Sequence, residues 1–427
     1  MEIATTGRVR ALCRTAALAP LFALGLTAFA ASSHAQTIEQ QESDLKPCGT
    51  YDASVLEPRP IPETLGGQAA LDAMAKEGFR FSATWLGAPD DIPAAWYYDV
   101  KITPDQAKRI CEKHLTAVFL DWSGAPLDLA LRSGIKNVLS ALGIRLIRIA
   151  DYSFDPNGMA GTLNALLPLH PDILITGGTV NPAQYAAILK PAIDQNITIV
   201  SWALGSPSLK VGKDGPIKAL VAMDFFQLGA NMADGMHEVW PDGANFGYIH
   251  WINDVPPIQA RETGMLERLK KYPNIKIITN GEISPKETAS GYNNPSSSTA
   301  FTQAFLTAHP EVNVLFAPWE DPPAIGEAGA IKALGLQDKV KIVTEDLANN
   351  GAYQLRNNGI IAVDIVEGIY DGGRLLAMTA ALSAIGENEH PYVMVPTFYV
   401  TSKTNIKQAW EFMLGPEVPC PASDCGE

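Results

Sequence analysis

Indoles and carboxylates recur just past the ends of the predicted strands in this sequence. The residues that we select as ligand-binding candidates are Trp122, Ser123, Trp202, Asp224, Phe225, Trp251, Arg261, Trp319, Glu320 and Asp346. Indole faces can stack on the apolar C–H faces of a sugar ring, while carboxylates and Arg bond to its hydroxyl groups. This set therefore suits a neutral polyhydroxylated ring. A cationic ligand would also fit Trp beside carboxylate, through cation–π attraction.

The segment Glu311–Gly335 shows this arrangement within a single βα unit. Its apolar run rich in β-forming residues ends at Phe316, and apolar residues at helical spacing begin near Ala324. Trp319 and its acidic neighbours lie between the two elements, where an open parallel sheet presents its ligands. A single Trp at such a position is as well explained by core packing. Four such Trp residues together favour a binding site.

Arg261 begins a predicted helix just after a predicted strand. A guanidinium at this position could contact a ligand through two parallel hydrogen bonds. It could equally remain in solvent and pair with Glu262 or Glu267, because exposed Arg is the commoner state.

We find no recognisable catalytic or metal-binding motif. There is no GxSxG, HExxH, P-loop, or GxGxxG after a strand. His250 is near the end of a predicted strand but has no nucleophile in view. Glu320 and Asp321 are adjacent, so their side chains diverge and do not form a glycosidase pair. We predict a protein that is not an enzyme and needs neither a metal nor a cofactor.

The first thirty-five residues have the pattern of a secretory signal. Three Arg residues precede an apolar region from Ala17 to Ala30, and Ser33–Ala35 has the small-x-small pattern of a cleavage site. A membrane anchor is the alternative, but fourteen apolar residues fall short of the roughly twenty that span a bilayer. We predict an exported, periplasmic protein.

Charge and cysteine content agree with this location. The chain has 46 acidic and 32 basic residues, so it lacks the basic stripe that nucleic acid binding requires. Beyond the signal it keeps four cysteines, which allow three disulfide connectivities. Cys48–Cys111 would staple an amino-terminal arm, and Cys420–Cys425 would close a small loop in the tail. Zinc is the rival reading, but the sequence has no CxxC.

Strands and helices alternate for almost three hundred residues from Leu115. This alternation is typical of parallel strands joined by helical crossovers. The chain is also longer than the roughly 250 to 300 residues that a single hydrophobic core accommodates. We therefore predict an α/β protein with two Rossmann-like lobes. The predicted parts are a signal at 1–35, an extension at 36–114, a first lobe at 115–223 with 368–388, a second lobe at 224–367 with 389–405, and a tail at 406–427.

Three passages carry a resemblance to a known family. They are FLTAHPEVNVLFA at 305–317, Arg261-x-x-Gly264-Met265, and NGIIAVD at 358–364. With the order of elements from Thr116 to Thr401, they resemble type I periplasmic sugar-binding proteins, the ribose-binding-protein-like receptors of ABC importers. The resemblance implies a three-strand hinge, with crossings near Asp224, Glu367 and Glu389.

Residue by residue, the resemblance puts Trp122 and Ser123 at the ligand and turns Arg261 toward the cleft. The family's Asn-Asp falls on Trp319–Glu320, and its next Asp falls on Asp346. Elsewhere the pattern departs: Ala203–Leu204 replace Asp-Arg, Gly177–Gly178 replace an Asn loop, and Val366 replaces Gln. Because polar groups are lost and indoles gained, a larger sugar, a polyol or a less polar ring is open.

The predicted function is ligand capture between two closing lobes, followed by docking on a membrane permease. The expected partners are a small carbohydrate or polyol and an ABC permease, with the protein itself a monomer. Two alternatives stay open: an exported sensor acting through a membrane receptor, and an exported carbohydrate-active enzyme.

Overall fold

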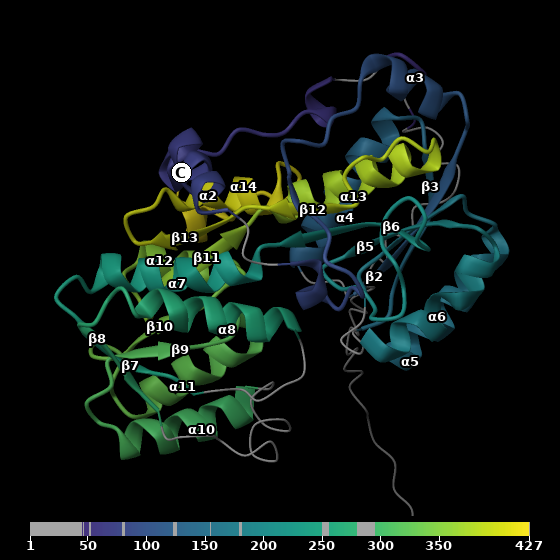
Figure 1. The fold of residues 1–427 in the computed structure, drawn as a ribbon. Coiled ribbons are helices and arrows are strands. Elements are labelled where there is room, and N and C mark those ends of the chain that lie inside the picture. The colour runs from purple at the N-terminus through teal and green to yellow at the C-terminus, as the bar shows by residue number, and fades with distance from the viewer. Residues whose placement is uncertain are drawn as a thin grey trace, which may run out of the picture. The chain divides into compact units, whose positions relative to one another are not determined.

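We describe the protein from a computed structural model. Elements keep the labels of Figure 1. The structure describes residues 45, 47–50, 53–78, 82–122, 126–153, 155–178, 182–249, 256–279 and 295–426. The predicted signal at 1–35 lies outside these ranges, as do Ser123 and Trp251.

Among the described residues, the first sheet has seven strands in the order β1-β12-β6-β5-β4-β2-β3, and all neighbours are parallel. Strands buried on both faces read as nearly continuous apolar runs, because helices cover each face of a parallel sheet. Helix α13 packs on β5 and β6, and α5 packs on β2 and β3. The bounds are β1 Ala95–Trp96, β2 Thr116–Asp121, β3 Arg145–Asp151, β4 Ile173–Thr176, β5 Thr198–Trp202, β6 Ile217–Met223, β12 Tyr392–Val395, α3 Pro104–Cys111, α4 Pro126–Ala141, α5 Pro156–Leu166, α6 Pro182–Asp194 and α13 Ile369–Ala384.

The second sheet has six described strands in the order β13-β11-β10-β9-β7-β8. Its neighbours run parallel except at the edge, where β13 is antiparallel to β11. Helix α7 packs on β11 and β13 and also contacts α8. The bounds are β7 Ala244–Gly247, β8 Ile275–Ile278, β9 Val314–Phe316, β10 Lys341–Val343, β11 Ile361–Glu367, β13 Thr397–Thr401, α7 Phe225–Val239, α8 Pro256–Leu269, α10 Pro295–Ala308, η5 Glu320–Ala324, α11 Ile325–Ala333, α12 Asn349–Arg356 and α14 Ile406–Leu414.

The main chain passes between the two sheets three times. It leaves the first sheet after β6 at Asp224 and returns after β11 at Gly368, so α13 lies beside α4 (Figure 1). The third passage is at Pro396, later than the predicted Glu389, because β12 of the first sheet continues to Val395 and β13 of the second sheet begins at Thr397. Pro has no N–H to give to a ladder, which fits its place between them. The predicted α/β class with two lobes is confirmed.

Among the described residues, two α-helices precede the first long strand. Helix α2 spans Gly67–Glu77. Thr103 caps α3: its hydroxyl accepts from the Gln106 amide at 3.3 Å, and the Gln106 side chain accepts from the Thr103 amide at 2.9 Å. This reciprocal capping satisfies two amides that the helix itself leaves without partners. In the described part of the chain, no helix has the length and apolar character needed to cross a bilayer.

The segment before α3, which we call the arm, contacts both halves of the protein, each of which is built on one sheet. It contains η1 (Ala53–Leu56), η2 (Glu63–Leu65), α2 and η3 (Ala83–Leu86), and its strand β1 extends the first sheet beside β12. The predicted Cys48–Cys111 disulfide is present and joins the arm to α3. On the other half, Glu77 of α2 pairs with Arg268 of α8 at 2.8 Å. The arm is therefore fixed to each half by separate contacts.

Arg59 connects the arm to the carboxyl-terminal helices. Its Nη2 lies 2.9 Å from Oδ2 of the buried Asp371 on α13, and its Nη1 donates to the carbonyl of Glu411 on α14 at 3.1 Å. Arg374 pairs with the other oxygen of Asp371. Two guanidinium groups thus share one carboxylate, and charged hydrogen bonds of this kind are stronger than neutral ones.

We expect Arg59→Met to lower the free energy of unfolding by about 2 kcal/mol, since a hydrogen bond to a charged group contributes about 1.5–3 kcal/mol. Urea denaturation measures the change. Arg109→Met is the matched control because Arg109 pairs with Glu387 at the exposed surface, where ion pairs contribute little. Equal losses in both variants would contradict a specific role for Arg59.

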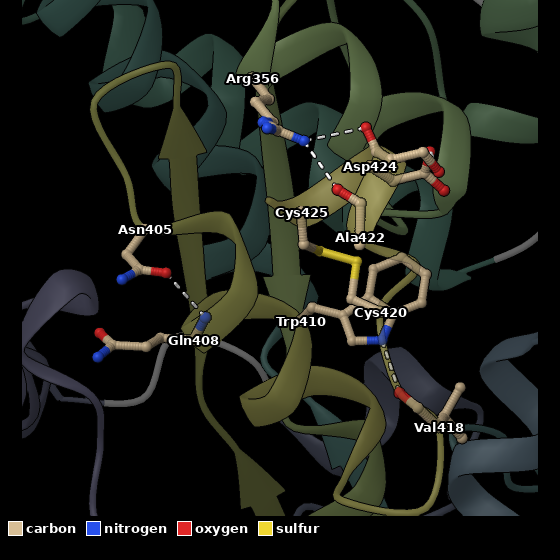
Figure 2. Close-up of a disulfide and its surroundings, with 10 residues drawn as sticks. Arg356, Asn405, Gln408, Trp410, Val418, Cys420, Ala422, Asp424 and Cys425 are labelled. Carbon is tan, nitrogen blue, oxygen red and sulfur yellow. Dashed lines mark hydrogen bonds between the residues drawn. A yellow bond between two sulfur atoms is a disulfide. The ribbon is translucent and has the colours of Figure 1, made fainter. Parts of the chain in front are cut away.

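The tail after α14 is folded back and closed by the second predicted disulfide, Cys420–Cys425. Figure 2 shows Arg356 donating to the carbonyl of Ala422 at 2.9 Å, and Trp410 donating its indole N–H to the carbonyl of Val418 at 2.7 Å. The tail is therefore held on α12 and α14 by side chains as well as by its own covalent loop.

Candidate ligand-binding site

Three strands of the second sheet end in polar or aromatic residues. Trp319 and Glu320 follow β9, Glu345 and Asp346 follow β10, and Glu367 ends β11. Since β9, β10 and β11 are parallel neighbours, these ends lie at one edge of the sheet, which is where open α/β sheets bind ligands. Of the predicted site residues, Trp319, Glu320 and Asp346 lie together at this edge.

Arg261 lies at this edge because α7 and α8 pack very closely. A Cβ at Gly229 would lie 1.8 Å from the carbonyl oxygen of Arg261, and one at Gly264 would lie 2.0 Å from that of Phe226. Only glycine permits this approach of two backbones. The Arg261 side chain is 2% exposed, so the expectation that it turns inward holds and the solvated alternative is wrong.

The guanidinium of Arg261 connects two of the strand ends. Its Nη1 donates to Oε1 of Glu345, and its Cζ lies 5.9 Å from the centre of the Trp319 ring, within cation–π range. Its Nε and Nη2 find no hydrogen-bond partner among the described residues. Arg261 thus has donors left over at the edge of the sheet.

Glu320 has a different role from its neighbours. Its carboxylate accepts from the backbone amides of Ala348 at 2.8 Å and Gly351 at 2.9 Å, at the start of α12. Burial raises its pKa to about 7, although these two hydrogen bonds favour the charged form. Helix α12 lacks a side-chain cap of its own. Glu320 therefore holds α12 in place, and this use occupies both of its oxygens.

Asp346 is half-buried and has a φ of 80°, a left-handed conformation that Asp adopts more readily than most residues. Burial raises its pKa to about 6, Arg261 opposes the rise, and Asp128 adds to it. Asp128 lies on α4, against the first sheet. Carboxylates of the two halves therefore lie within electrostatic reach of each other.

Three buried carboxylates of this cluster were not among the predicted site residues: Glu345, Asp364 and Glu367. Burial raises the pKa of each, and in Asp364 and Glu367 the surrounding carboxylates add to the rise. Position after a strand could have identified Glu345 and Glu367. An Asp inside the apolar run of β11 could have identified Asp364, because such a residue is seldom buried without a reason.

In the first half, Asp121 ends β2 and Trp122 follows it. The Trp122 backbone amide donates to Asp121 Oδ1 at 2.8 Å, and its indole N–H donates to the carbonyl of Gly178 at 3.2 Å. Arg132 of α4 pairs with the other Asp121 oxygen. Burial and Asp128 raise the pKa of Asp121 to about 7, against the opposing effect of Arg132. Trp122 is half-buried, and its hydrogen bond to Gly178 connects its indole ring to the loop after β4.

The other predicted residues lie elsewhere in the structure. Trp202 is 1% exposed and packs in the core, where a Cβ at Gly372 would lie 2.6 Å from its ring. Asp224 caps α7 by accepting from the Gln227 amide at 2.9 Å, and Phe225 is buried at the start of the same helix. Both belong to the first passage between the sheets. Ser123 and Trp251 lie outside the described residues.

A separate cavity of about 550 Å³ lies between α2, α7, α8 and β13. Its charged side chains already have partners: Arg268 pairs with Glu77 and Asp234, and Glu238 accepts from Tyr399 at 3.0 Å. Over the described ranges, no group of three or more His, Cys, Asp or Glu side chains could hold a metal ion. The strand ends remain the better candidate, because they retain buried groups without partners.

The family model described as "Periplasmic binding protein domain" matches residues 117–388. No curated protein matches the chain.

Solved structures show the same fold at low sequence identity. An ABC transporter solute-binding protein from Agrobacterium vitis, bound with alpha-D-tagatopyranose, is 17% identical; the match covers 70% of this chain and 99% of that one, with a TM-score of 0.57. A 5-methylthioribose transporter solute-binding protein from Thermotoga lettingae is 19% identical, with 71% and 94% covered and a TM-score of 0.56. A periplasmic ribose ABC transporter protein from Conexibacter woesei is 18% identical, with 70% and 97% covered and a TM-score of 0.59.

The family model covers more than half of the 427 residues and takes in strands of both sheets. Its limits also enclose Arg261, Trp319 and the carboxylates at the strand ends. This chain belongs to the periplasmic binding protein family.

Proposed function

We propose that this protein is the solute-binding component of an ABC importer, and that it binds a sugar or sugar-like molecule at the facing strand ends of its two halves. The observation that carries the proposal is the group formed by Arg261, Trp319 and Asp346, which combines hydrogen-bond donors, an aromatic face and carboxylates. Such a group matches the apolar faces and hydroxyls of a saccharide. The sugar-binding structures of the same fold support this ligand class.

The mechanism that we propose is closure of the two halves about the three passages at Asp224, Gly368 and Pro396. A solute that contacts both halves stabilises the closed arrangement in proportion to its additional contacts there. Trp122 would supply the contact from the first half. The closed protein would deliver the solute to a membrane permease from the periplasm, so no covalent step and no cofactor enters the mechanism.

Calorimetric screening of the exported chain against monosaccharides and polyols tests binding. We expect Trp319→Ala to weaken the binding of any hit about tenfold or more, since a lost aromatic face costs about 1.5 kcal/mol beyond its buried area. Trp240→Ala is the matched control. Trp240 directly follows α7, which ends at Val239, and it precedes β7, so it lies away from the carboxyl ends of the strands. Equal weakening by both variants would contradict this placement of the ligand.

Transport needs its own test. A strain that lacks the protein is expected to lose uptake of the identified solute and to regain it with the wild-type chain but not with Trp319→Ala. Binding without any change in uptake would favour the sensor alternative. Conversion of the sugar to a product would favour an enzyme.

A further inference from the structure

The ligand-binding edge holds more buried carboxyl groups than its cations can match. Glu345, Asp346, Asp364 and Glu367 act on one another electrostatically, and Asp128 of the first half acts on Asp346. Arg261 is the cation that acts on Glu345 and Asp346, and it already pairs with Glu345. A neutral sugar would leave this imbalance unchanged.

Several atoms in this cluster are buried without a partner. Glu367 is 0% exposed, and neither of its carboxylate oxygens accepts a hydrogen bond from another described residue. The same is true of one oxygen each of Glu345 and Asp364. Burying an unpaired polar or charged group costs several kcal/mol, so such groups are normally matched by a partner. Here the protein supplies acceptors and lacks the donors that would match them.

Arg261 adds the opposite requirement. Its free Nε and Nη2 need an acceptor. A ligand carboxylate would fit those donors but would lie beside Glu345 and Asp346, while the charge of Arg261 is already matched by Glu345. A hydroxyl oxygen satisfies the same donors without that repulsion.

We propose that the solute carries a protonated amine next to hydroxyl groups, as in an amino sugar or amino polyol. The amine would donate to Glu345, Asp346 and Glu367, and a hydroxyl would accept from Arg261. An ammonium supplies three N–H donors and one positive charge, which the unpartnered oxygens require. This inference rests on the proposed function, because it names the class of solute for the same site.

Binding of a cationic solute should depend on pH in a way that binding of a neutral ligand does not. Around Asp346, whose pKa is raised to about 6, lie Arg261 of α8, Asp128 of α4, Glu320 of η5, Glu345, and Asp364 and Glu367 of β11. A cation in their midst favours the ionised carboxylates, so its binding expels protons. The affinity for the cationic solute should therefore rise as pH increases through about 6.

The experiment uses the full exported chain. Calorimetry compares D-glucosamine with D-glucose and D-galactosamine with D-galactose, in buffers of different ionisation heat, and native mass spectrometry identifies any solute that co-purifies from the periplasm. We expect the amines to bind at least about tenfold more tightly than their neutral partners, with release of protons. Glu367→Gln should reduce this preference. Glu112→Gln, at the exposed end of α3, should leave it unchanged.

Each other outcome is decisive. A neutral sugar that binds as well as its amine, or a co-purified solute without a basic nitrogen, overturns the amine and leaves the proposed function intact. Preference for an amino acid with a free carboxylate overturns the assignment of Arg261 to a hydroxyl. If no solute co-purifies and none of the probes binds, the inference and the proposed function both fall.

Discussion

Replacing Arg261 with Met is expected to lower the free energy of unfolding by about 3–5 kcal/mol above about pH 8, where Glu345 is ionised in the wild type. This is the usual effect of removing one partner of a buried ion pair. Arg261 and Glu345 are both buried and paired. Methionine fills much of the same volume, so the loss reflects the carboxylate left without a cation more than a cavity. Chemical denaturation followed by circular dichroism measures it.

The same variant should depend on pH in a defined direction. Burial raises the pKa of Glu345 above its ordinary value of 4.5, and in the variant nothing opposes that rise. Well below pH 8 Glu345 is protonated in both proteins, so the deficit should shrink as pH falls through about 8. The double variant Arg261→Met/Glu345→Gln should recover most of the loss. A double variant as unstable as the single one would instead assign the loss to packing.

Glu367→Gln is expected to have the opposite effect and to stabilise the empty protein by about 1–3 kcal/mol above neutral pH. It replaces a buried acid, which must either keep its proton or bury a charge, with a neutral side chain of the same shape. Glu367 is fully buried, and its carboxylate accepts from no other described residue. The gain should be accompanied by weaker solute binding. The wild-type protein would then be less stable than the variant because it keeps an acid that the solute needs.

The pH dependence of this stability gain follows from the linkage between proton binding and folding. Burial and the charges of Asp346, Glu345 and Asp364 raise the folded-state pKa of Glu367 above 4.5. Above pH 4.5 the unfolded chain therefore releases a proton that the folded chain keeps, and wild-type stability falls as pH rises. The variant lacks this fall, so its advantage should be absent near pH 4.5 and grow with pH. Unfolding measured across pH checks it, with the exposed Glu112→Gln as control. A variant less stable than wild type at high pH would show that Glu367 forms a stabilising contact.

Sequence signals of short range predicted much of the fold. Thr103 and Gln106 lie three residues apart, so their reciprocal cap depends only on local backbone geometry. Apolar runs such as β11 are recognisable because strands of a parallel sheet are buried on both faces. The strand-end rule located Trp319 and Asp346 for the same reason: the carboxyl ends of parallel neighbours share one edge.

Contacts between distant residues were beyond that reasoning. Glu320 and Asp346 looked alike in sequence, yet Glu320 is occupied by the amides of α12, some thirty residues later, while Asp346 keeps its place beside Arg261. Trp202 and Trp319 also looked alike, but Gly372 leaves room for Trp202 inside the core. Which polar group finds a partner depends on side chains that meet only after folding.

The amino-acid order alone therefore determined the α/β class, the two halves, the disulfide-forming cysteines and the position of Trp319 and Asp346 after strands, because periodicity, capping and strand polarity are local properties. Only the tertiary structure decided that β12 and β13, on either side of Pro396, belong to different sheets and that the arm contacts both halves. It also decided that Glu345, Asp364 and Glu367 are buried together around Asp346. Their charges are matched or left unmatched across distances in the chain that no local pattern records.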